Sequence, residues 1–154
     1  MTTLGFTLVT IPNKGKGYGN IYLLAKTPEY TQTIHPNSTI KFNGFTKLAT
    51  MSWKTADTIT MLKAGLFQIT FQVTYVTNTE TNIQIGLYVN GELITVFGDS
   101  ILLDNGISKL SGTYVLKVKL NDKIQFVGLE NTFVIKPVSQ SSEIIASVTI
   151  VEVQ

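Results

Sequence analysis

The chain has 154 residues, of which 44% are hydrophobic and only 14% are charged. This length suits one domain with one hydrophobic core. The charged fraction lies well below the usual value of about 25%, which excludes a disordered chain. The formal net charge is +2, cysteine is absent, and the basic residues are all lysine. The composition therefore excludes disulfides and thiol chemistry, and without arginine or a dense lysine run we expect no nucleic-acid partner.

The N-terminal residues show no targeting signal. Met1 to Phe6 lack a basic region followed by an apolar stretch and a cleavage site, so no signal peptide is recognised. No apolar run approaches the roughly 18 residues of a membrane span. Residues 13–19 hold three glycines and two lysines, and we interpret them as a flexible loop because no helix follows to bind a phosphate. We expect residues 1–19 to be an extension or an extra strand, and residues 20–154 to form the domain.

The first half of the domain contains several short strand patterns. Residues 20–26 are apolar on both faces, which suits a strand between its own core and a partner. Residues 31–42 are strand-like around a turn at 35–38, and residues 57–62 form another short strand. His35 is the only histidine, so we expect a turn residue rather than a metal ligand. The core candidates here are Ile40, Phe42, Phe45 and Leu48.

Three aromatic residues are weak candidates for ligand binding. Trp53 is the sole tryptophan and stands between polar residues, where core packing is favoured over a platform for sugar rings. Tyr30 and Tyr88 are the other aromatic residues that could stack on a sugar.

Residues 64–91 carry the clearest pattern in the chain. From Phe67 to Tyr75 every odd position is large and apolar, and every even position is Gln or Thr. Side chains of a strand point to alternate faces, so this strand has one apolar face and one polar, uncharged face. A second apolar strand runs from residue 83 to residue 89. Asn90-Gly91 then tolerates the positive φ angles of a tight type I′ hairpin, which predicts a third strand antiparallel to the second.

The remaining strands follow at hairpin spacing. We expect them at residues 92–97, 109–120, 123–128, 133–138 and 143–153, with a short apolar piece at 101–103. Asn121-Asp122 supplies a tight turn, and the last strand is apolar on both faces. About ten strands and no convincing helix predict an all-β sandwich.

The order of these motifs resembles a known family. Ala64-Gly65-Leu66-Phe67 leads into the alternating strand, Tyr88-Val89-Asn90-Gly91 ends the next, and Leu120-Asn121-Asp122 closes a long one. This arrangement resembles the jelly roll of tumour necrosis factor (TNF) cytokines and complement C1q globular heads, over about residues 20 to 153. Asn121 stands where glycine is common in this family, and the resemblance implies that it adopts a positive φ, for which asparagine is the natural substitute. It looks closest to the bacterial heads that cap collagen-like filaments on spore and cell surfaces. No Gly-x-y repeat precedes the domain, which does not favour a place at a filament tip.

The resemblance implies a ten-stranded TNF/C1q-like jelly roll that assembles as a homotrimer. One sheet would contain the strand from Leu66, the strand 109–120, and the first and last strands, and its outer face would pack against neighbouring chains. The resemblance places these residues at the trimer interface: Gln68, Thr70, Gln72, Thr113 and Val115. Gln and Thr carry no charge to desolvate and can satisfy one another. A solvent-exposed outer face remains the alternative, although such faces normally recruit Lys and Glu.

The sequence offers little for catalysis. Cysteine is absent, histidine is solitary, and the acidic residues are scattered over turns and strand ends, so we expect no enzyme, no catalytic residue and no cofactor. A glycosidase-like carboxylate pair is the weaker alternative. Asp99, Asp104 and Asn105 offer oxygen ligands in one loop, but without an EF-hand spacing we expect no metal site.

The functional hypothesis is a non-enzymatic homotrimeric head, serving as a structural or ligand-binding module at a bacterial cell or spore surface. It would be made in the cytoplasm and would bind itself and a surface protein or glycan, through loops at 77–82, 98–108 and 129–142. The alternative is a receptor- or carbohydrate-binding tip such as a phage fibre head.

Overall fold

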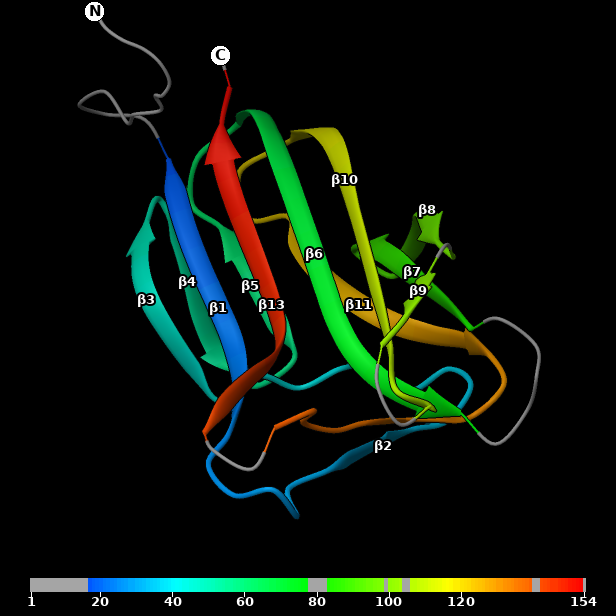
Figure 1. The fold of residues 1–154 in the computed structure, drawn as a ribbon. Helices are drawn as coiled ribbons and strands as arrows, with labels where there is room; N and C mark the ends of the chain where they lie inside the picture. The colour runs from blue at the N-terminus through cyan, green and yellow to red at the C-terminus, as the bar shows by residue number, and fades with distance from the viewer. Residues whose placement is uncertain (1–16, 78–82, 99, 104–105, 140–141, 154) are drawn as a thin grey trace, which may run out of the picture.

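The computed structural model describes residues 17–77, 83–98, 100–103, 106–139 and 142–153, and within them the chain is an all-β sandwich of two antiparallel sheets. Figure 1 shows the larger sheet in front of the smaller one. These ranges contain thirteen strands in two sheets, so the expected all-β sandwich is confirmed, with more strands than the ten expected.

The larger sheet has eight strands. Its longest strand, β6, pairs along one side with β10 and along the other with β13 and then β12. The bounds are β1 Tyr18–Ala25, β2 Gln32–Ile34, β3 Gly44–Ala49, β6 Gly65–Thr77, β9 Ser100–Leu102, β10 Ser108–Val118, β12 Phe133–Ile135 and β13 Glu143–Glu152.

The smaller sheet has five strands in the order β4, β5, β11, β7, β8. The bounds are β4 Met51–Thr55, β5 Thr58–Met61, β7 Gln84–Val89, β8 Glu92–Phe97 and β11 Lys123–Glu130. The β7–β8 hairpin turns at Asn90 (φ 52°) and Gly91 (φ 83°), and Asn121 in the β10–β11 turn has φ 72°. The positive φ angles predicted for these turns are therefore confirmed.

The core lies between the sheets and is centred on a stack of phenylalanines. The ring of Phe71 on β6 lies 4.5 Å from that of Phe126 on β11, with an angle of 12° between the planes, and 5.8 Å from that of Phe97 on β8. Gly112 on β10 leaves room for this stack, because a Cβ atom there would lie 2.2 Å from the Phe97 ring. The apolar parity of residues 67–75 thus faces the smaller sheet, as the alternation predicts.

Three sequence-based expectations about the first half of the domain were wrong. Phe45 was expected in the core but is 52% exposed, because it lies on β3, the last strand of its sheet. Residues 31–42 were expected to be strand-like on both sides of a turn at 35–38, and β2 lies before the turn as expected, but after it Thr39 forms only an isolated bridge with Val127. Instead β3 and β4 occupy residues for which no strand was expected.

The interpretation of residues 13–19 as a flexible loop was also wrong for its described part. Tyr18 and Gly19 belong to β1, and Gly17 is buried beside Thr50 and Phe67. A Cβ atom on Gly19 would lie 2.1 Å from the Met51 sulfur, so this glycine serves close packing rather than flexibility. The boundary proposed at residue 20 falls inside β1, and residues 1–16 lie outside the described residues.

Candidate functional site

The outward face of the larger sheet carries the predicted interface residues in regular rows. Gln68, Thr70 and Gln72 on β6 point away from the core, and each lies between an outward residue of β10 and one of β13. The three rows are Val115–Gln68–Val151, Thr113–Thr70–Thr149 and Ser111–Gln72–Ser147. The structure thus brings all five predicted interface residues together on one face.

Strand β1 extends this face with residues that the sequence analysis did not select. Tyr18 lies opposite Val151, Asn20 opposite Thr149 and Tyr22 opposite Ser147. The signal for them was only partial: Asn20, Ser147 and Thr149 are polar, but Tyr22 and Val151 made both strands apolar on both faces in the sequence. We call the twelve outward positions of the three rows and β1 the polar face.

Hydrogen bonds between side chains link the polar face across its strands. The hydroxyl oxygens of Thr70 and Thr113 lie 3.4 Å apart, the Gln72 amide donates to Ser147 Oγ at 3.1 Å, and the Asn20 amide donates to Thr149 Oγ1 at 2.9 Å. The exposed Gln68 amide has no such partner within the described part of the chain. The face therefore keeps unused donors and acceptors for a partner surface.

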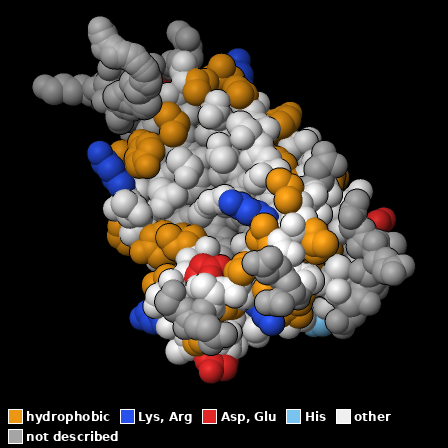
Figure 2. Space-filling model, in the orientation of Figure 1, with side chains coloured by type: hydrophobic (Ala, Val, Ile, Leu, Met, Phe, Trp, Pro, Cys, Tyr) orange, Lys and Arg blue, Asp and Glu red, His pale blue; other side chains and the backbone are white. Residues whose placement is uncertain are grey.

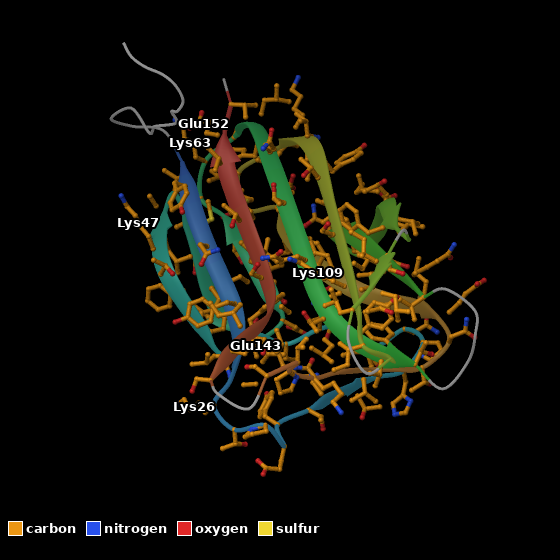
Figure 3. All side chains as sticks on the ribbon, in the orientation of Figure 1. Lys26, Lys47, Lys63, Lys109, Glu143 and Glu152 are labelled. Carbon is orange, nitrogen blue, oxygen red and sulfur yellow. The ribbon has the colours of Figure 1, made fainter. Side chains whose placement is uncertain are left out.

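No residue of the polar face is charged. The charged residues nearest to it in the sheet are Lys47 beside Asn20, Lys109 beside Thr74 and Lys117 beside Leu66. Figure 2 shows uncharged side chains over the upper part of β13 and β6, with a lysine near the middle of the view, where Figure 3 labels Lys109, and acidic side chains below it. A solvent-exposed sheet face of this size usually carries Lys and Glu, so the polar face has the composition of a covered surface.

The edge of the sandwich next to β10 is apolar. On β9, Ile101 and Leu102 are 68% and 72% exposed, and Leu93 and Val96 on β8 are also exposed. Val115 of the polar face also lies on β10, beyond the residues that pair with β9. Clusters of exposed aliphatic residues commonly mark protein contacts. The sequence analysis identified residues 101–103 only as a short apolar piece.

The three weak ligand candidates do not form one site. Tyr30 lies in the β1–β2 loop and packs partly against the core. Trp53 is on β4 and Tyr88 is on β7, and β5 and β11 separate these strands. The Trp53 indole N–H donates to the Ala56 carbonyl at 3.1 Å.

The described residues offer no obvious catalytic or metal-binding cluster. No group of three or more His, Asp or Glu residues is placed to hold a metal ion within the described ranges. His35 Nδ1 lies 3.3 Å from Thr132 Oγ1 in a surface contact. The calcium candidates Asp99, Asp104 and Asn105 lie outside the described residues. In the same ranges, no helix is long and apolar enough to cross a membrane.

Two carboxylates link stability to pH. Burial raises the pKa of Glu143, but hydrogen bonds from the backbone N–H groups of Val138 (3.0 Å) and Ser139 (2.8 Å) outweigh it, so the pKa lies below the usual 4.5. Burial likewise raises the pKa of Asp57, and hydroxyl groups of Thr39 and Thr58 outweigh this, so its pKa lies below 3.8.

A carboxylate whose pKa is lower in the folded state than in the unfolded state stabilises the fold at pH values above its unfolded-state pKa. This stabilisation is lost as the pH falls through the folded-state pKa. We expect the urea concentration at the unfolding midpoint to stay constant near neutral pH and to decrease when the pH is lowered below about 4.5. Glu143→Gln should have a lower midpoint near neutral pH, and its deficit should shrink as the pH falls. A deficit that is the same at about pH 7 and about pH 3 would contradict this linkage.

Comparison with protein families and with curated proteins finds no match. Among solved structures, the chain is similar to the Eiger TNF of S. frugiperda, with a TM-score of 0.68, 8% identity, and coverage of 90% of this chain and 93% of that one. It is also similar to the globular domain of zebrafish complement 1qA, with a TM-score of 0.61, 16% identity, and coverage of 90% and 98%. The sandwich is therefore a jelly roll. It has the fold shared by TNF and complement C1q globular domains.

Proposed function

We propose that the chain is a non-enzymatic head domain that assembles as a homotrimer through the polar face. The observation that carries this proposal is the absence of charge at twelve outward positions in the middle of the larger sheet. Uncharged amides and hydroxyls lose little when water is removed and can pair with copies of themselves. The fold shared with the TNF and complement globular domains supports a head domain.

The apolar edge around Ile101 and Leu102 supports a ring rather than a two-fold dimer. A two-fold contact needs one self-complementary patch, whereas two different patches that fit each other produce a head-to-tail contact. If the edge of one chain packs beside the β1 side of the next chain's polar face, the contacts close into a ring in which the Thr70 side chains of the copies meet at the axis. Three copies are the number that the resemblance implies. A homotrimer buries both the exposed aliphatic edge and the amide of Gln68.

Single cysteines test this arrangement well, because the chain contains no other cysteine. Thr70→Cys places one thiol in the middle of the polar face. Thr60→Cys is the matched control, since Thr60 is also a half-buried threonine but lies on β5 of the smaller sheet. Under mild oxidation we expect Thr70→Cys to yield covalent dimers, with the third thiol of each trimer left free, and Thr60→Cys to remain monomeric on a denaturing gel. Equal cross-linking of both variants would contradict the proposal.

We also propose that this head domain acts at the surface of a bacterial cell or spore. This proposal rests on the resemblance of residues 64–67, 88–91 and 120–122 to the bacterial head domains. In such a head the loops between strands would bind a surface protein or a glycan.

A carbohydrate-binding tip is the second candidate, and one observation favours it. Phe45 is 52% exposed and its ring meets that of Trp53 edge to face, with centroids 6.1 Å apart. An exposed aromatic pair at the β3–β4 corner is a surface on which a sugar ring can stack. Glycan binding that is lost in Trp53→Ala would support this function, whereas no binding in a glycan screen would favour the structural head.

A further inference from the structure

A second group of exposed aliphatic side chains lies at one end of the sandwich, where β5 turns into β6 and β10 turns into β11. Leu62 and Leu120 are 50% and 59% exposed. Their turns are joined, because the Met61 N–H donates to the Asp122 carbonyl at 2.8 Å and the Asn121 N–H donates to the Met61 carbonyl at 2.7 Å. The two leucines therefore lie on adjacent turns.

Two further aliphatic residues continue this group. Leu66 and Val153 are 37% and 39% exposed, and the Val153 N–H donates to the Leu66 carbonyl at 2.9 Å. We call Leu62, Leu66, Leu120 and Val153 the leucine tip. Figure 2 shows hydrophobic side chains with a lysine beside them at the upper end of the molecule, where β6 begins and where β10 and β13 end.

The charges around the leucine tip are mainly positive. Lys117, Lys119 and Lys123 are exposed on the same ends of β10 and β11. Two acids lie close to them, and both are already engaged. Glu152 is buried and accepts from Lys63 Nζ at 3.0 Å, as labelled in Figure 3, and from the Gly17 N–H at 2.8 Å.

The second acid, Asp122, accepts from the Lys119 N–H at 2.8 Å and from the Asn90 amide at 2.8 Å. No exposed carboxylate lies on residues 62–66, 117–123 or 152–153, all of which the structure describes. The tip therefore combines exposed aliphatic groups with three exposed lysines.

We propose that the leucine tip binds the surface of an anionic lipid bilayer. Aliphatic side chains on two adjacent turns can enter the boundary between headgroups and acyl chains, while neighbouring lysines remain at the level of the headgroups. Each lysine close to an anionic surface strengthens binding by about five-fold. The charge complementarity selects an anionic bilayer over a neutral one. This inference concerns the end of the sandwich and does not depend on the polar face being an interface.

Co-sedimentation with lipid vesicles tests the proposal on the full chain. We compare vesicles of phosphatidylcholine alone with vesicles that also contain phosphatidylserine. Leu62→Ser/Leu120→Ser removes the two most exposed leucines of the tip. Phe45→Ser/Ile144→Ser is the matched control, since these residues are 52% and 51% exposed and lie elsewhere. Thermal melts show that each variant is folded.

We expect the natural sequence to bind vesicles with phosphatidylserine at least about ten-fold more tightly than neutral vesicles. The tip variant should bind them at least about ten-fold more weakly than the natural sequence, because two half-exposed leucines no longer enter the bilayer. The control should be unchanged. Absence of binding to anionic vesicles would overturn the proposal. Equal binding by the tip variant would also overturn it, since lysines alone would then act on any acidic surface.

Discussion

Replacement of Phe71 by alanine is expected to lower the free energy of unfolding by about 3–5 kcal/mol. Phe71 is fully buried, and its ring stacks on Phe126 at 4.5 Å and on Phe97 at 5.8 Å, so one side chain joins β6 of the larger sheet to two strands of the smaller one. Truncation leaves a cavity that rigid β-strands cannot close. Because small domains are stable by only about 5–15 kcal/mol, this is a large part of the total.

Urea denaturation of the natural protein and of Phe71→Ala measures this effect. Both should be compared at the same chain concentration, because self-association links stability to concentration. Phe45→Ala is the control, since Phe45 is half exposed on an edge strand. We expect it to cost less than about 1 kcal/mol. A cost for Phe71→Ala no larger than that of the control would contradict a core centred on the phenylalanine stack.

Replacement of Thr70 by glutamate is expected to convert the three-chain assembly into folded monomers. Thr70 is in the middle row of the polar face, between Thr113 and Thr149. In a homotrimer three carboxylates would be brought close together and taken out of water without a cation, which is strongly unfavourable. In the monomer the same carboxylate points away from the core and remains hydrated.

Light scattering together with circular dichroism measures both parts of this prediction. Thr60→Glu is the control, because it adds the same charge to the outward side of the smaller sheet. We expect the three-chain mass to be lost in Thr70→Glu and kept in Thr60→Glu, with strand content unchanged in both. A Thr70→Glu variant that keeps its mass would exclude the polar face as the interface.

The sequence predicted the fold best where local patterns and tertiary packing agree. The alternation from Phe67 to Tyr75 places β6 and identifies both of its faces. Asn90, Gly91 and Asn121 were predicted to adopt positive φ, and all three do. These features depend on backbone geometry and on side-chain parity, which are local properties of the chain.

The errors occur where neighbouring strands decide the outcome. Phe45 is large and apolar like a core residue, but it lies on β3, an edge strand that pairs with a neighbour in the sheet on one side only. Gly19 is packed against the Met51 sulfur, a contact between residues far apart in the chain. Burial on an edge strand and the space available to a glycine depend on the arrangement of the sheets, which single-sequence patterns do not contain.

Only part of the candidate site was predicted, because the rest depends on how the strands pair. Alternation identified Gln68, Thr70 and Gln72 as polar positions of one strand, and the register of β1, β10 and β13 adds the residues beside them. Strand pairing joins segments that lie far apart in the chain, such as those of Gln72 and Ser111, so it needed the structure. The apolar edge at Ile101 and Leu102 likewise becomes evident only when β9 is placed on the outside of β10.

The molar mass of the natural protein in solution tests the central claim most directly. A head domain whose uncharged sheet face is covered by copies of itself should give about three times the 16.9 kDa of one chain, over a wide range of concentrations. A mass of one chain at all accessible concentrations would leave Gln68, Thr70 and Gln72 in contact with water and would contradict the account.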